Sequence, residues 1–199
     1  MEILDKAQQF VEHSTLTLTG EEDFIPFIIV TDDSDKEFFV GFTSMPSSPE
    51  AKDSLADMIM ALCIVYGAAK AAFGSTAWYA EGSGDLPPSQ RPDRKEIAVV
   101  SAANYDGIVG IRVAPVVRES NKVGVGLWEE MPTVAASGRF AEALHMGLKL
   151  SRKMPPATRE FLRGLLDEGM EEEILRSTAG IITEARRNGL SVEKGDWEK

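Results

Sequence analysis

Cysteine, histidine and basic residues are scarce in this sequence of 199 residues. It has one cysteine, two histidines, and 21 lysine and arginine residues against 32 aspartate and glutamate residues, for a formal net charge of −11. A lone cysteine cannot form an intrachain disulfide, so the fold does not depend on an oxidising compartment. With two histidines and one cysteine, no zinc site can be assembled from residues close in sequence. We therefore predict no metal and no cofactor.

The shortage of positive charge bears on which partners the chain can bind. An acidic protein is repelled by phosphate backbones, so a nucleic-acid binder of this charge would need a strong local basic patch. The basic residues form only short clusters, at Arg91, Arg94 and Lys95 and at Arg186 and Arg187. We predict that the protein does not bind nucleic acid directly.

Long hydrophobic runs are also missing. The longest apolar stretch, residues 58–73, contains Lys70 and is shorter than the ~20 residues that a membrane-spanning helix needs. The N-terminal residues are acidic and amphipathic, unlike a secretory signal peptide. These features predict no membrane association and a cytoplasmic location, in a bacterial cell or an infected host cell.

Common catalytic and ligand-binding motifs are absent or incomplete. No G-x-S-x-G nucleophile elbow is present, and the glycines of residues 123–126 lie within a predicted strand instead of opening a helix, unlike a dinucleotide-binding loop. The acidic segment 31–37 fails as a calcium loop, because Phe38 and Ser44 stand where an EF-hand needs glycine and glutamate. That segment is predicted to be a solvated hairpin tip.

Hydrophobic periodicity and turn residues predict an α+β fold in the order α-β-β-α-β-β-β-β-α-α-α. The predicted helices are 2–13, 49–73, 134–150, 156–168 and 171–188, and the predicted strands are 23–30, 36–43, 75–81, 95–103, 107–117 and 122–130. We predict a mixed, mostly antiparallel six-stranded sheet with a long central helix.

The long helix connects strands 36–43 and 75–81, which we expect to be parallel neighbours joined by a right-handed crossover. The predicted organisation is a sheet domain over 1–131, a C-terminal helical region over 132–190 packed on it, and a frayed tail over 191–199.

The segment GSGDLPPSQRPDRKE, residues 82–96, is the densest group of unusual residues. Arginines beside an aromatic side chain can hold a carboxylate or phosphate, so we predict a ligand site from five residues. They are Trp78, Glu81, Asp85, Arg91 and Arg94. The alternative is a stiff connection, in which Asp93 and Glu96 pair with both arginines and the prolines restrict the free loop.

This region resembles a segment of uncharacterised bacterial and phage proteins, in which a tryptophan-containing strand precedes a P-S-x-x-P-x-R-x-E stretch. The matching residues are Pro88, Ser89, Pro92, Arg94 and Glu96, with Trp78 upstream. The resemblance covers about 30 residues and implies no function.

Three functions are consistent with these features. The first is a non-enzymatic binding or accessory protein of bacterial or phage origin that acts through a protein partner or a small anionic ligand. The second is a hydrolase-like enzyme that binds a nucleotide or anion through residues 78–96, with Glu81 or Asp85 as base and the arginines as an anion clamp. The third is acidic mimicry of nucleic acid.

Because five helices barely cover both faces of six strands, we also predict a homodimer with the C-terminal helices near the contact.

Overall fold

The computed structural model describes residues 2–20, 22–82, 86–132 and 139–187. The helices are α1 (Ile3–Thr15), α2 (Pro49–Val65), α3 (Arg139–Lys153), α4 (Pro156–Asp167) and α5 (Glu171–Arg187), with a short 3₁₀ turn at Pro88–Gln90. The strands are β1 (Phe27–Asp32), β2 (Glu37–Gly41), β3 (Ala68–Tyr79), β4 (Lys95–Asn104), β5 (Gly107–Glu119), β6 (Lys122–Val125) and β7 (Glu129–Met131). The predicted start of the third helix and the predicted tail, 191–199, lie outside the described residues. None of the helices formed by described residues is long and apolar enough to cross a membrane.

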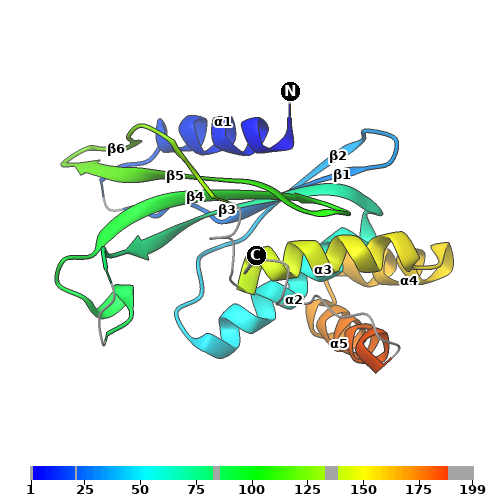
Figure 1. Cartoon of the computed structure of the whole chain (residues 1–199). Coiled ribbons are helices and arrows are strands. Elements are labelled where there is room, and N and C mark those ends of the chain that lie inside the picture. Colours follow the sequence, from blue (N-terminus) through cyan, green and yellow to red (C-terminus); the bar gives the residue numbers. More distant parts are fainter. Residues whose placement is uncertain (1, 21, 83–85, 133–138, 188–199) are drawn as a thin grey trace.

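The α+β class and the order of the elements are confirmed (Figure 1). The strands form one curled sheet in the order β2-β1-β3-β4-β5-β6, and the short β7 also pairs with β5. Every strand pair is antiparallel. The hairpins predicted after strands 23–30 and 95–103 are both present, the second closed by Gly107 at a φ of 145° and by the Asn104 side chain.

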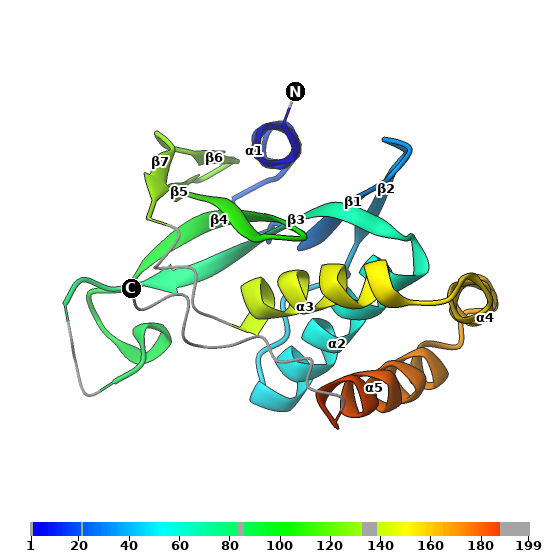
Figure 2. The same ribbon diagram turned by 45° about the vertical axis from the view of Figure 1, so that its right-hand side comes forward.

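The two faces of the sheet carry different helices (Figures 1 and 2). Helix α1 lies along one face, and α2 and α3 lie on the other. Helices α4 and α5 pack mainly against α2 and each other. On the second face the buried core is continuous from the strands through α2 and α3 to Leu162 of α4 and Ile182 of α5.

The predicted parallel pairing of strands 36–43 and 75–81 is wrong. Strand β1 lies between β2 and β3 and pairs antiparallel with both of them. Strands β2 and β3 do run in the same direction, but they are not neighbours. The hairpin supplies the reason, since folding β2 back on one edge of β1 leaves the other edge of β1 free for β3.

The predicted extent of the long helix is also wrong, because α2 ends at Val65 instead of Phe73. Gly67 adopts a left-handed conformation with a φ of 64°, which ends the helix in the manner common for glycine. The next residues, AAKAAF, start β3, the strand between β1 and β4. Apart from the exposed Lys70, these residues are small or apolar and fit a central strand that is largely buried. Periodicity does not distinguish them from a buried helix.

The predicted strand 122–130 is split into β6 and β7 by Gly126. A Cβ atom at Gly126 would lie 2.7 Å from the Cγ of Pro115, and the Gly126 amide donates to the Pro115 carbonyl. The glycine is favoured because the Pro115 ring approaches closely there, in keeping with a glycine within a strand that marks a close approach.

Candidate functional site

Arg91 closes the base of the loop that joins β3 to β4. Its guanidinium donates hydrogen bonds to the carbonyl oxygens of Glu81 and Gly82, at 2.7 and 2.9 Å. It also forms an ion pair with Asp93, with an Nη2–Oδ2 distance of 2.7 Å. This hydrogen bond lowers the pKa of the Asp93 carboxyl. Arg91 therefore ties the start of the loop to its end.

The other arginine of the loop has different partners. The Arg94 guanidinium lies over the Trp78 ring, 4.5 Å from its centre, and donates to the Ser89 carbonyl. Stacking of this kind contributes about 0.5–1 kcal/mol at exposed sites. Arg94 thus holds the 3₁₀ turn against the last residues of β3.

Of the acidic residues considered in this region, Asp93 pairs with Arg91 as the alternative predicted, whereas Glu81 and Glu96 pair with other cations. The Glu81 carboxylate pairs with Lys95 at 3.3 Å. Asp85 lies outside the described residues. The expected pairing of Glu96 with a loop arginine is wrong, because Glu96 pairs with Arg118 at 2.7 Å. These contacts give the loop an internal network that connects it to the sheet.

Arg91→Ala is expected to lower the free energy of unfolding by about 1 kcal/mol, because hydrogen bonds to both ends of the loop are lost. For a chain of this size we expect the thermal midpoint to fall by roughly 2–4 °C. Lys95→Ala is the matched control, since its exposed ion pair with Glu81 should contribute little. An unchanged Arg91→Ala midpoint together with lost binding of an anionic probe would make Arg91 a binding residue instead.

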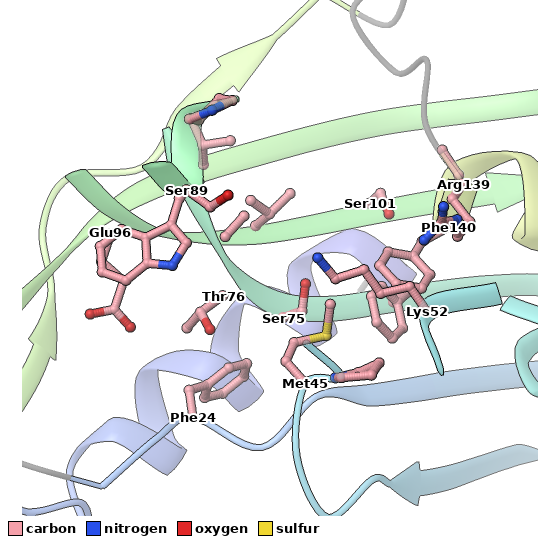
Figure 3. Close-up of a pocket in the computed structure, with 18 of the residues that line it drawn as sticks. Phe24, Met45, Lys52, Ser75, Thr76, Ser89, Glu96, Ser101, Arg139 and Phe140 are labelled. Carbon is pink, nitrogen blue, oxygen red and sulfur yellow. The ribbon is translucent and has the colours of Figure 1, made fainter. Parts of the chain in front are cut away.

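A pocket of about 790 Å³ opens beside the loop, at the end of the sheet where β3 and β4 extend beyond β1; we call it the sheet-end pocket (Figure 3). Its floor consists of side chains from neighbouring strands on the face that carries α2 and α3. They are Phe73, Ser75, Ala77, Val99, Ser101, Ile111, Val113 and Met131. The walls come from the segment between β2 and α2, from the N-terminal turns of α2 and α3, and from the 3₁₀ turn.

The pocket also extends around the edge of β3 toward the face that carries α1. Thr76 and Trp78 line it there, together with Phe24 from the segment that precedes β1. The Trp78 side chain is 45% exposed. Because successive side chains of a strand point to opposite faces, Ser75 and Trp78 reach the pocket from two sides of the same strand.

Lys52 is the charged residue of the pocket that has no ion pair among the described residues. Asp23 and Glu96 both pair with Arg118, and Arg139 pairs with Asp53 at 2.8 Å. Lys52 lies in the first turn of α2, is half-buried, and extends into the pocket toward the strand that carries Ser75 (Figure 3). Within the described ranges, the Lys52 charge in the pocket therefore has no ion pair, although the chain as a whole is strongly acidic.

Two hydroxyl groups lie on the pocket floor near this charge. Ser75 and Ser101 are 6% and 7% exposed, and neither hydroxyl has a hydrogen-bond partner among the described residues. Buried hydroxyls are usually hydrogen-bonded, so these two are available to a ligand or to water. Together with Lys52, they allow the pocket to hold an anionic group next to an apolar surface.

Of the predicted site residues with a described position, Trp78 lines this pocket, Arg94 contacts it through Trp78, and Glu81 and Arg91 are not among its lining residues. Sequence reasoning missed Lys52, Ser75 and Ser101. A signal existed for Lys52, since a cation in the first turn opposes the helix dipole and is unfavourable there without another role. For Ser75 and Ser101, the signal that could have pointed to a site was a hydroxyl side chain within a predicted, mostly apolar strand.

The remaining titratable candidates lie in the core. Burial raises the pKa of the Cys63 thiol to about 12, so the reactive thiolate does not form near neutral pH. His145 is buried on α3, and its pKa is lowered mainly by that burial. No cluster of metal-ligating side chains occurs within the described part of the chain.

Comparison with known proteins adds no assignment. No protein-family model, no curated protein and no solved structure matches this chain. The resemblance of residues 88–96 to a segment of bacterial and phage proteins stays a prediction.

Proposed function

We propose that this chain is a non-enzymatic binding protein whose sheet-end pocket receives a ligand or partner that presents an apolar group beside an anionic group. The observation that carries the proposal is the placement of Lys52, a cation with no ion pair in the described part of the chain, beside an apolar floor. Binding pockets are commonly apolar surfaces with a few polar groups that orient the ligand.

The size and lining of the pocket support this proposal. Its volume of about 790 Å³ falls within the ~300–1,000 Å³ typical of small-molecule sites. Phe73, Phe140 and Val99 are among the apolar side chains that line it. An apolar group of several carbon atoms would gain about 25 cal/mol for each Å² that it buries on this surface.

The distribution of charge supports an anionic ligand. A cation that is partly removed from water is stabilised by a carboxylate, sulfonate or phosphate, and hydrogen bonds between such charged groups are stronger than neutral ones. Lys52 is the residue best placed to make this contact, because Arg139 already pairs with Asp53.

The enzyme hypothesis has less support. Its proposed anion clamp uses Arg91 and Arg94, which are engaged by loop carbonyls, Asp93 and Trp78. Acidic mimicry likewise needs free acidic groups, and Asp5, Asp23, Glu37, Glu96 and Glu130 each pair with a lysine or arginine. The homodimer stays a prediction; Phe161 of α4, 58% exposed, is an apolar side chain available for such a contact.

Lys52→Gln is expected to weaken binding of anilinonaphthalene sulfonate about tenfold or more, since a hydrogen bond to a charged group contributes about 1.5–3 kcal/mol. N-phenylnaphthylamine, which has similar rings and no charge, should bind both proteins with similar affinity. Fluorescence titration measures both dissociation constants.

Lys70→Gln is the control for this test, because Lys70 is exposed on β3 and is not among the residues that line the pocket. Circular dichroism should show the same thermal midpoint for both variants and the unaltered protein. The proposal would be contradicted if Lys52→Gln weakened binding of the charged and uncharged probes equally, or if it weakened binding of neither probe.

A further inference from the structure

The last five residues of β3 are paired on one side only. The β1–β3 pairing begins at Phe27 opposite Gly74, whereas the β3–β4 pairing continues to Tyr79 opposite Lys95. Residues 75–79 of β3 therefore have β4 on one edge and, within the residues that the structure describes, no strand on the other. Among the described residues, no group outside the sheet forms a hydrogen bond with their backbone. Such an edge is a template for another extended chain.

The segments that flank this edge turn away from it in opposite directions. The chain before β1 is held on the face of the sheet that carries α1, where Arg118 donates to the carbonyl oxygens of Gly20 and Glu22. The chain after β2 leads to α2, on the other face. Figure 2 shows β3 and β4 extending together away from β1 and β2. The sheet-end pocket lies in the space between the two departing segments.

An extended peptide in this position would use both parts of the pocket. Five residues at about 3.3 Å each span roughly 17 Å, which matches the open length of β3. Alternate side chains of the peptide would face the apolar floor around Ala77 and Val99, and the others would lie beside Trp78 and Phe24. Strand addition supplies main-chain hydrogen bonds, while the pocket selects the side chains.

The start of β1 limits where such a peptide can end. Strand β1 is antiparallel to β3 and occupies the neighbouring position from Phe27 onward. For a peptide that runs antiparallel to β3, in line with β1, the paired stretch therefore ends near Ser75 on its C-terminal side. A parallel peptide would instead place the N-terminal side of its paired stretch there.

Lys52 distinguishes these two directions. Its side chain extends toward the strand at Ser75, and it has no ion pair among the described residues (Figure 3). A terminal carboxylate at this point would pair with the Lys52 ammonium and accept hydrogen bonds from the hydroxyl groups of Ser75 and Ser101. A terminal ammonium would be repelled by it.

From this geometry we propose that the partner is the free C-terminal segment of another protein, about five extended residues long, which adds to β3 antiparallel over residues 75–79. The inference rests on the proposed function, because it identifies the ligand of the same pocket. It requires apolar side chains at alternate positions of the segment and a free terminal carboxylate.

The test uses the full chain and a library of random heptapeptides displayed with free C-termini. Selected peptides are then synthesised as the free acid and as the C-terminal amide, and both are titrated by fluorescence polarisation. The acid is expected to bind at least about tenfold more tightly than the amide, because only the acid pairs with a charged donor. In Lys52→Gln this difference should disappear, whereas Lys70→Gln should retain it.

Hydrogen exchange locates the bound peptide. Backbone amides within residues 75–79 that face the open edge should exchange more slowly in the complex, because they become hydrogen-bonded to the peptide. The inference is overturned if no peptide is selected, if acid and amide bind equally, or if protection occurs elsewhere. If any of these results is obtained while anilinonaphthalene sulfonate still binds in a Lys52-dependent way, the proposed function stands. If binding of this probe does not depend on Lys52, both the proposed function and the C-terminal peptide inference are overturned.

Discussion

Phe27→Ala is expected to lower the free energy of unfolding by about 3–5 kcal/mol. Phe27 is fully buried at the start of β1, with the Phe10, Phe24 and Phe39 rings centred 4.5, 5.9 and 5.5 Å from its own. Its ring also covers Gly74, where a Cβ atom would lie only 2.3 Å from it. The alanine variant would therefore leave a cavity that neighbouring backbone cannot fill, and the aromatic pairs would be lost.

Urea denaturation followed by circular dichroism measures this loss. Phe161→Ala is the matched control, because Phe161 of α4 is 58% exposed and its removal should change stability by about 0.5 kcal/mol or less. A Phe27→Ala midpoint as high as that of Phe161→Ala would show that the α1 side of the sheet is not tightly packed around this ring.

Gly147→Ala is expected to destabilise the protein by about 1–3 kcal/mol, although alanine is the better helix former. Gly147 lies in α3 where this helix crosses α2. A Cβ atom at Gly147 would be 2.9 Å from the Cβ of Cys63 and 3.0 Å from the Cα of Met60. Backbone atoms cannot rotate away as a flexible side chain can, so the two helices would have to move apart and loosen the core between them.

The same substitution at Gly164 and Gly180 provides the control. Both glycines are exposed on helices, in α4 and α5, and a Cβ atom at either would meet nothing within 4 Å. Each alanine should stabilise the protein by about 0.5–1 kcal/mol through helix propensity alone. Thermal melts of the three variants give the comparison, and a stabilised Gly147→Ala variant would mean that α2 and α3 do not approach this closely.

Local signals were sufficient where neighbouring residues decide the structure. Ser48 caps α2 by accepting a hydrogen bond from the Ala51 amide, and Pro49 begins the helix, as the segment SPE predicts. Gly107 and Asn104 close the β4–β5 hairpin for the same kind of reason. These choices depend on backbone groups within a few residues, so they can be read without knowing the rest of the fold.

The candidate site was less predictable. The proline-rich loop attracted attention because of its composition, yet Arg91 uses its hydrogen bonds within the loop and Trp78 is the residue that lines the pocket. Lys52 and Ser75 are 23 positions apart in the sequence, and they lie on α2 and β3. Their approach depends on how α2 packs on the sheet, which no short stretch of sequence encodes.

The sequence by itself determined the α+β class, the order of the elements and the hairpins, because helix caps, turn residues and hydrophobic periodicity act over short distances. Only the tertiary structure decided that AAKAAF forms a central strand, since two flanking strands and helices on both faces bury most of it, with Lys70 exposed (Figure 1). It also decided that β1 separates β2 from β3 and that β3 extends beyond β1, which creates the open edge and the pocket beside Lys52. Strand neighbours and pocket walls arise from long-range packing, in which many weak contacts compete and the whole chain sets the outcome.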